Sequence, residues 1–374
     1  MTKNLQLLLS VVTIVTCFHF NYAQCNDVTL ESITNPGLYD VETLTESDGL
    51  PDSSDYREVT VYYPTNGTPP YPSIAIVPGF TAGPGSVRAW GPYYASHGII
   101  AIVIGTNNRN AFPDARATAL IAALKTLENE NTRTSSPLNG QVDIDKFAVS
   151  GHSMGGGGAQ RAAVMNANIK AVVALCPWLP TFNRPSLDHS APVLIFSGQN
   201  DSTAQPSQHA DVHYNTTPEE TDKLLYEIKN GNHSVANTPG GAQGNVGKLA
   251  ISWLRSKLNN NSCYCSLIND ELLDNPATAS TFETNVSCQT LSVDEIDTNA
   301  QLTTSIYPNP TNSYVTIESD FAISKSYEIF SLLGEHLVSG RITAKKEQID
   351  LSNLKPNIYL LNIDNQVFKI LKTE

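Results

Sequence analysis

Short apolar runs rich in β-branched residues alternate with longer stretches of helical spacing through the middle of the chain. Such runs predict buried strands, and the stretches between them predict the helices that join parallel strands. The predicted strands lie at 73–79, 99–105, 146–151, 169–176, 192–198 and 224–231. The predicted helices lie at 114–129, 154–166, 207–214 and 244–258. We therefore expect an α/β fold, with a mostly parallel sheet, helices on both faces and an antiparallel strand at 58–64 near one edge.

From about residue 304 onward the pattern changes to a strict alternation of apolar and polar residues, interrupted by turn residues. This pattern predicts a small all-β sandwich at 304–374. The preceding stretch, 289–303, is polar and acidic and lacks a core pattern, so we expect it to be a linker. The α/β domain is then expected to span 25–288.

The N-terminus combines Lys3 with an apolar run from Leu5 to Phe20 and the small residue Ala23. This order is typical of a secretory signal peptide, which we predict at 1–24. A membrane anchor is the alternative, but the run is short for a bilayer span and no second run follows. We therefore expect a secreted protein.

Charge and cysteines refine this picture. The formal net charge of −13 at pH 7 disfavours nucleic acid and anionic membranes as partners. Cys176 ends an apolar run and is expected to be a buried free thiol. A bridge between Cys263 and Cys265 would be strained, so Cys288 is expected to pair with one of them and Cys25 with the other.

The stretch "GHSMG" matches G-x-S-x-G and lies between a predicted strand and a predicted helix. In that context the serine sits on a strained turn at a helix N-terminus, so Ser153 is the candidate nucleophile. The backbone N–H of Met154 and that of Phe80, in the turn after the first parallel strand, are the candidate donors to a tetrahedral oxyanion. A purely structural glycine turn is the alternative, and the flanking strand and helix disfavour it.

A serine hydroxyl needs a base, and the base needs an orienting carboxylate. Asp201 lies 48 residues after Ser153, at the end of one predicted strand, and His233 lies 32 residues further on, after the next strand. Both are expected at the carboxyl edge of the sheet, together with Ser153. His189 is the nearest rival base, but it precedes the acid and breaks the expected chain order.

Two aromatic residues in loops at this edge, Phe80 and Trp178, are predicted to contact substrate, with core packing as the alternative. His152, beside the nucleophile, is predicted to line the cleft. The chain has no cluster of histidines and carboxylates with the spacing of metal ligands, so we expect no metal and no cofactor.

The stretch from about 55 to 290 resembles the cutinase-like polyester hydrolases, including the poly(ethylene terephthalate) hydrolases, of the α/β-hydrolase superfamily. The resemblance rests on "PGFTAG", "WGPYYASHGIIAIVIGTN", "PDARATALIAALKTL", "VDIDKFAVSGHSMGGGGAQRAA", "CPW" and "APVLIFSGQND". It implies the same triad and oxyanion donors, and Trp178 as an aromatic clamp on the substrate. It also implies substrate contacts near Thr81, Thr203 and Ser234, where this chain departs from common family residues.

The tail from about 304 to 374 resembles the C-terminal sorting domain of the type IX (Por) secretion system. The resemblance rests on "YPNPTNSYVTI", "YEIFSLLGEHL", "IDLSNLKPNIYLLNI" and "KILK". It implies that the tail directs secretion and that the secretion machinery is a partner. A carbohydrate-binding module is the alternative for this region.

These features together predict a secreted serine esterase of cutinase type, acting as a monomer on polyesters and short carboxylic esters through an acyl-enzyme. A lipase or small-ester carboxylesterase with the same triad is the alternative enzyme. A binding protein built on an inactive hydrolase is disfavoured because every element of the triad is present.

Overall fold

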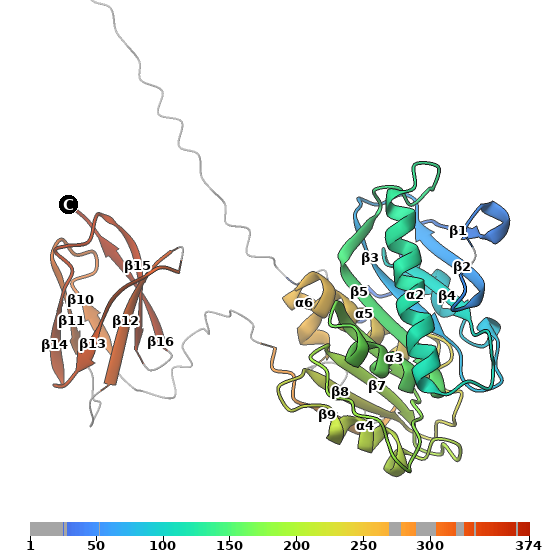
Figure 1. The fold of residues 1–374 in the computed structure, drawn as a ribbon. Helices are drawn as coiled ribbons and strands as arrows, with labels where there is room; N and C mark the ends of the chain where they lie inside the picture. The colour runs from blue at the N-terminus through green and yellow to red at the C-terminus, as the bar shows by residue number, and fades with distance from the viewer. Residues whose placement is uncertain are drawn as a thin grey trace, which may run out of the picture. The chain divides into compact units, whose positions relative to one another are not determined.

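The computed structural model describes residues 25, 28–51, 53–268, 278–288, 304–318, 325–332, 334–363 and 366–374. The predicted signal peptide at 1–24 and the predicted linker at 289–303 lie outside the described residues. The chain divides between Thr290 and Leu291 into two compact units, each of which is described by itself (Figure 1).

Within the described residues, nine strands of the first unit form one sheet in the order β1-β2-β4-β3-β5-β6-β7-β8-β9. Their bounds are β1 (Val41–Thr45), β2 (Arg57–Pro64), β3 (Tyr71–Val77), β4 (Ile100–Gly105), β5 (Val142–His152), β6 (Ile169–Leu175), β7 (Val193–Gly198), β8 (Lys223–Ile228) and β9 (Ala279–Thr284). Strands β3 to β8 run parallel to their neighbours in this group. Antiparallel β1 and β2 complete one side and antiparallel β9 the other. The predicted mostly parallel sheet is confirmed.

Helices cover both faces of this sheet (Figure 1). Their bounds are α1 (Trp90–Ser96), α2 (Pro113–Thr132), α3 (Met154–Met165), α4 (Ala210–Thr216), α5 (Asn245–Asn259) and α6 (Ser262–Ser266). Buried side chains of α2, α3 and α4 share one apolar cluster with the sheet, and those of α1 and α5 share the other. The two clusters correspond to the two faces of the sheet, as expected for an α/β fold.

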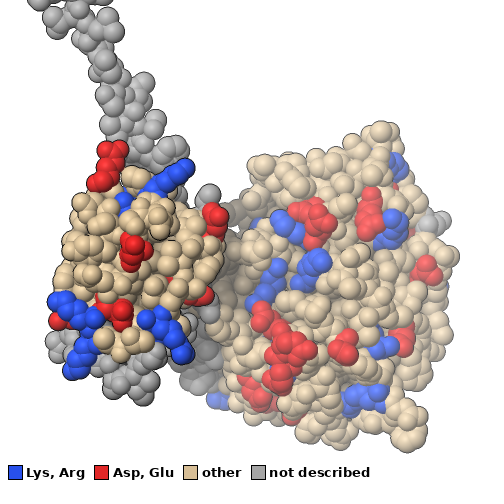
Figure 2. Space-filling model, turned by 60° about the vertical axis from the view of Figure 1, so that its left-hand side comes forward, with Lys and Arg blue, Asp and Glu red and all other residues tan. Residues whose placement is uncertain are grey.

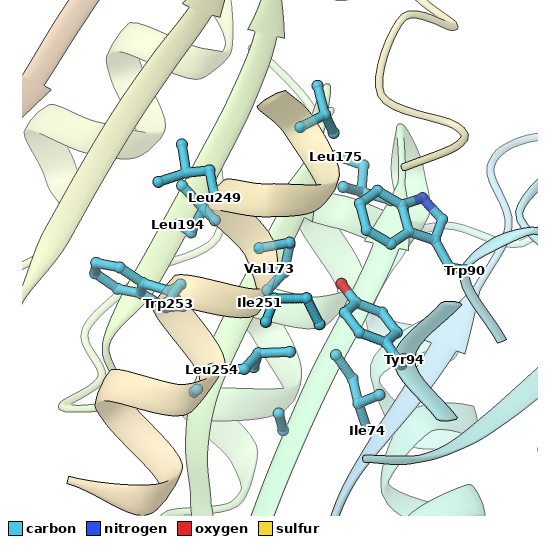
Figure 3. Packing of buried hydrophobic residues seen from close by; sticks show 14 of the residues in the cluster. Ile74, Trp90, Tyr94, Val173, Leu175, Leu194, Leu249, Ile251, Trp253 and Leu254 are labelled. Atoms are coloured by element: carbon cyan, nitrogen blue, oxygen red, sulfur yellow. The ribbon is translucent and has the colours of Figure 1, made fainter. Parts of the chain in front are cut away.

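The α1–α5 face has a core in which aromatic and aliphatic side chains interlock (Figure 3). Trp90 and Tyr94 of α1 stack with 5.1 Å between ring centroids, beside Ile251 and Leu254 of α5. Helix α1 was not among the predicted helices. Six of its seven residues are buried, so it lacks the polar face that makes a helix visible in a sequence.

Strands β1 and β9 were not predicted either. Each lies at an edge of the sheet and is only partly buried, so its residues show no continuous apolar run. Edge strands of this kind take their conformation from pairing with a neighbour, here with β2 and β8 respectively.

Two disulfides close the first unit, joining Cys25 to Cys263 and Cys265 to Cys288. Cys176 is a buried free thiol. The predicted pattern is confirmed, and the fold selects Cys265 as the partner of Cys288.

The second unit consists of two antiparallel sheets. One sheet contains β10 (Ser305–Tyr307), β11 (Tyr314–Glu318) and β14 (Lys346–Asp350). The other contains β13 (His336–Ile342), β12 (Lys325–Ser331), β15 (Asn357–Ile363) and β16 (Gln366–Lys372). Val315 and Ile317 of the first sheet share a core with Ile329 and Leu361 of the second. The predicted small all-β sandwich is confirmed.

Acidic and basic side chains are interspersed over the faces of the two units that are visible in Figure 2. In the described part of the chain, no helix has both the length and the apolar character needed to cross a membrane. Nor do three or more potential metal-ligating side chains gather anywhere among these residues.

Candidate active site

Ser153 occupies the turn between β5 and α3 with φ 57° and ψ −120°, a conformation that non-glycine residues rarely adopt. Its main chain is tied to the end of β6. The Ser153 N–H donates to the Leu175 carbonyl at 2.9 Å, and the Ser153 carbonyl accepts from the Trp178 N–H at 2.8 Å. These bonds hold the strained backbone at the carboxyl edge of the parallel strands.

The glycines that follow Ser153 allow close backbone approach. A Cβ atom at Gly155 would lie 2.4 Å from the Val77 carbonyl oxygen, and one at Gly157 would lie 2.2 Å from the Trp178 carbonyl oxygen. Both distances are far inside van der Waals contact, so these positions exclude any side chain. Helix α3 is thereby able to approach the end of β3 and the loop after β6 at once.

His233 and Asp201 come from the loops after β8 and β7, and their side chains meet. The Nδ1 atom of His233 lies 2.7 Å from Oδ2 of Asp201. Since a carboxylate only accepts, Nδ1 donates this bond and Nε2 of the neutral ring is left with its lone pair. The Asp201 carboxyl is buried, whereas the His233 ring is partly exposed. An imidazole held in this tautomer is suited to accept a proton at Nε2.

The other oxygen of Asp201, Oδ1, accepts hydrogen bonds from the backbone N–H groups of Thr203 and Ala204, each at 2.8 Å. Burial by itself raises the pKa of Asp201, but the bonds from His233 and from these two amides lower it below the usual value. The carboxylate therefore stays ionised at neutral pH.

His152 links the serine turn to the histidine loop. Its Nε2 donates to the main-chain oxygen of His233 at 2.7 Å, and the two imidazole rings lie 4.6 Å apart between centroids. Burial lowers the pKa of His152 to about 4, although its hydrogen bond acts in the opposite direction. His152, which directly precedes Ser153, is therefore neutral at physiological pH and braces the His233 loop.

The loop after β3 also approaches the serine. A Cβ atom at Gly79 would lie 2.9 Å from the Cβ of Ser153, which places Phe80 next to the turn. Thr81 adopts a positive φ of 59°, and its N–H donates to the Arg109 carbonyl at 2.8 Å. Met154 is the first residue of α3, where backbone N–H groups lack helical partners. Two backbone segments with available donors thus flank Ser153.

Aromatic side chains form one side of the site. The Trp178 ring stacks on the buried His209 ring with 5.7 Å between centroids and an interplanar angle of 29°. The Phe112 ring lies 6.3 Å from Trp178 at an angle of 47°. Phe80 is 50% exposed and Phe112 is 61% exposed. Solvent-facing rings at one edge of a sheet provide a surface for an apolar or aromatic ligand.

Thr203 and Ser234, the remaining predicted contacts, differ in exposure from His189, the rival base. The side chains of Thr203 and Ser234 are exposed at the loops that carry Asp201 and His233. The rival base, His189, is buried ahead of β7, where its main-chain oxygen accepts from the Thr221 hydroxyl at 2.7 Å.

Three residues of the site were missed in the sequence. His209, Phe112 and Arg116 were not among the predicted site residues. Phe112 directly precedes Pro113, the first residue of α2, and an aromatic residue just before a helix start is the signal that was available for it. Arg116 stands among apolar residues in the first half of a helical face that also contains Glu130, and an arginine at that place was the available sign of a buried cation.

The sheet topology and the strained serine turn define the class of protein: this is an α/β-hydrolase. Residues 21–288 match the family model described as PET hydrolase-like. The chain belongs to the PET hydrolase-like family and is a carboxylic ester hydrolase.

Curated relatives agree with this assignment. Cutinase est1 of Thermobifida alba is 35% identical over 209 residues, covering 56% of this chain and 68% of the relative. Cutinase 1 of Thermobifida cellulosilytica is 32% identical over 242 residues, covering 65% and 87%. The bis(hydroxyethyl) terephthalate hydrolase of Streptomyces coelicolor is 34% identical over 208 residues, covering 55% and 63%.

The tail has its own match. Residues 305–373 match the secretion system C-terminal sorting domain. This domain assigns the protein to type IX secretion and makes the secretion machinery a partner. The protein is therefore exported, to the medium or the cell surface.

Proposed function

We propose that this hydrolase is a serine esterase of cutinase type in which Ser153 is the nucleophile, His233 the base and Asp201 the orienting carboxylate. The backbone N–H groups of Phe80 and Met154 donate to the oxyanion. These five groups make a complete serine-esterase set, and we propose that the enzyme acts as a monomer without a cofactor.

In the first half of the reaction, the Ser153 hydroxyl oxygen attacks the ester carbonyl carbon while its proton moves to Nε2 of His233. The two backbone N–H groups bind the negative oxygen of the tetrahedral intermediate. Collapse of this intermediate breaks the bond to the alcohol, which leaves with the proton from His233. An acyl-enzyme remains. In the second half, water gives a proton to His233 and attacks the acyl carbon, and collapse releases the acid and restores the serine.

The observation that carries the proposal is the buried carboxylate of Asp201 bonded at 2.7 Å to His233, on the edge of the sheet where Ser153 adopts its strained turn. The bond fixes the imidazole tautomer that a base requires. The hydrogen bond from His152 to the main-chain oxygen of His233 supports the same assignment, because it ties the base to the residue beside the nucleophile.

The proposed substrates are polyesters with aromatic or aliphatic acid units, together with short carboxylic esters. The relatives are named as cutinases and as a bis(hydroxyethyl) terephthalate hydrolase. The exposed rings of Phe80 and Phe112 beside Trp178 favour aromatic acid units. A lipase or small-ester carboxylesterase with the same triad is the second candidate.

The mechanism is tested with the full-length chain and its Ser153→Ala variant on p-nitrophenyl acetate and p-nitrophenyl butyrate. We expect the variant to lose at least 1000-fold in kcat/KM, since the nucleophile is removed. The exposed Ser207→Ala variant is the matched control and should keep wild-type kinetics. Turnover that survives in Ser153→Ala would assign the nucleophile to another residue.

The substrate class is tested by comparing three substrates with the wild-type protein. An amorphous poly(ethylene terephthalate) film should release terephthalate and its mono(hydroxyethyl) ester, whereas a long-chain triglyceride emulsion should be hydrolysed slowly. Fast triglyceride hydrolysis with an untouched film, while p-nitrophenyl butyrate is cleaved, would identify a lipase or ordinary esterase instead.

A further inference from the structure

Arg116, in the first turns of α2, is an arginine with no exposed surface. No ion pair with a carboxylate is found for it within the described ranges. Its guanidinium instead donates to two main-chain carbonyls, with Nη1 2.9 Å from the Pro78 oxygen and Nη2 2.8 Å from the Arg109 oxygen. Burial lowers the pKa of Arg116 to about 10, so it remains a cation at neutral pH. A buried cation is costly, and within the described residues only these two bonds offset the cost, because the Arg116 Nε is buried without a hydrogen-bond partner.

The two carbonyls connect Arg116 to both sides of Phe80, one directly and the other through a neighbouring segment. Pro78 precedes the loop directly. The Arg109 carbonyl, on the neighbouring segment, also accepts from the N–H of Thr81 at 2.8 Å. The guanidinium thus anchors the Pro78 end by a direct bond and the Thr81 end through Arg109. The peptide that contains the Phe80 N–H lies between these anchors.

The nucleophile helix is shaped around the same side chain. A Cβ atom at Gly158 of α3 would lie 2.8 Å from the Cβ of Arg116. Glycine at this position therefore lets α2 bring Arg116 under the loop while α3 presents Ser153. The guanidinium, the Phe80 loop and the serine turn form one packed unit.

We propose that Arg116 is a positioning residue, which holds the Phe80 N–H in the orientation needed to bind the oxyanion at Ser153. The inference rests on the proposed function, because it takes Ser153 as the nucleophile and Phe80 as an oxyanion donor. Arg116 acts through the backbone and does not touch the substrate. Its loss should weaken binding of the transition state more than binding of the ground state.

The test compares Arg116→Met and Arg116→Lys with wild type in the full chain. One readout is kcat and KM for p-nitrophenyl acetate. The other is Ki for an alkyl trifluoromethyl ketone, which adds to the serine and places a negative oxygen in the oxyanion hole. Removal of a whole donor costs about 100- to 1000-fold in kcat. Arg116→Met leaves the Phe80 N–H in place and removes only the side chain that orients it. We therefore expect a smaller loss, about 10- to 100-fold in kcat/KM.

The Ki should rise by a similar factor while KM changes less than about threefold. Arg116→Lys keeps the cation, but an ammonium group can bond only one of the two carbonyls at a time. Its kcat/KM and Ki should therefore fall between those of wild type and Arg116→Met. It also serves as the deciding variant if Arg116→Met does not fold.

The matched control is Arg161→Met. Arg161 of α3 bonds Asp114 of α2 at 2.7 Å, so its loss weakens the same pair of helices without touching the Phe80 loop. It should lower the thermal midpoint and leave Ki unchanged. If the Arg116 variants lose stability but match Arg161→Met in Ki and kcat/KM, Arg116 is structural only and the inference is wrong. A Ser153→Ala variant that retains activity would instead overturn the proposed function.

Discussion

Trp178 has two aromatic neighbours with opposite surroundings. His209 is buried against the tryptophan ring and fixes its position from the protein side, whereas Phe112 faces solvent. Burial lowers the pKa of His209 to about 4, so the stack is a contact between neutral rings at neutral pH. An exposed aromatic ring beside a supported one costs hydrophobic free energy in the free protein. That cost is recovered when a flat apolar group covers both rings.

We therefore predict that Phe112→Ala selectively weakens hydrolysis of aromatic substrates. The rate of product release from poly(ethylene terephthalate) film and kcat/KM for bis(hydroxyethyl) terephthalate should each fall about 3- to 10-fold, as expected for one lost aromatic contact. Turnover of p-nitrophenyl acetate should stay within twofold. Phe182→Ala is the control, because Phe182 is 82% exposed and, within the described residues, makes no ring contact with Trp178. Equal losses in both variants would contradict a specific role for Phe112.

Helix α3 is rich in residues that disfavour a helix. Its first turns contain four consecutive glycines, each costing about 1 kcal/mol relative to alanine in a helix interior. The cost is accepted because the helix must approach β3, the Trp178 loop and α2 more closely than any side chain permits. Packing around the active site, and not helix stability, therefore determines these residues.

Gly157→Ala tests this interpretation. The new methyl group would lie 2.2 Å from the Trp178 carbonyl oxygen, so the loop after β6 has to move. We expect a loss of about 1 to 3 kcal/mol in the free energy of unfolding, as for other overpacked cores. We also expect a larger loss of activity on film than on p-nitrophenyl acetate. Gly85→Ala is the control, because a Cβ at Gly85 would have no atom within 4 Å. Unchanged stability in Gly157→Ala would show that the Trp178 loop can move without loss of free energy, and it would contradict this interpretation.

At the scale of the whole molecule, burial keeps several histidines neutral. Burial lowers the pKa of His97, His152, His189 and His209 to about 4 each and that of His213 well below 6.5. In the unfolded chain these rings titrate near 6.5. When the pH falls below that value, the unfolded state binds protons that the folded state does not. Acidification therefore favours unfolding.

We predict that the free energy of unfolding decreases steadily from about pH 6.5 to about pH 4. Above pH 7 these histidines are neutral in both states, so they should add almost no pH dependence. Denaturant unfolding at several pH values measures it. His97→Gln removes one of these rings, so it should reduce the slope of the unfolding free energy against pH by up to about one proton. His97 suits the test because it lies outside the proposed triad, where its ring hydrogen-bonds to the Thr34 carbonyl at 3.0 Å. A flat profile between pH 6.5 and 4.5 would show that the buried rings take up protons without unfolding.

The sequence by itself determined the class of fold and the candidate chemistry. Alternating apolar runs and helical stretches predicted the central parallel strands and the helices between them, because burial imposes those periods on any sequence. The G-x-S-x-G motif and the order of Ser153, Asp201 and His233 predicted which loops bear the proposed triad, because parallel strands bring their carboxyl ends to one edge. The family and the secretion tail were also recognisable from local motifs.

Only the tertiary structure decided the features that depend on distance between segments. Cys263 and Cys265 are two residues apart and equivalent as sequence, and only the fold pairs Cys263 with Cys25 and Cys265 with Cys288. Buried α1 and the edge strands β1 and β9 acquire their structure from neighbours, so local pattern does not mark them. The contacts of Arg116 and Phe112 belong to the same group. Arg116 bonds Pro78 and Phe112 contacts Trp178, tens of positions away in the sequence. No sequence period records which main-chain oxygen a guanidinium will reach or which ring will stay in solvent.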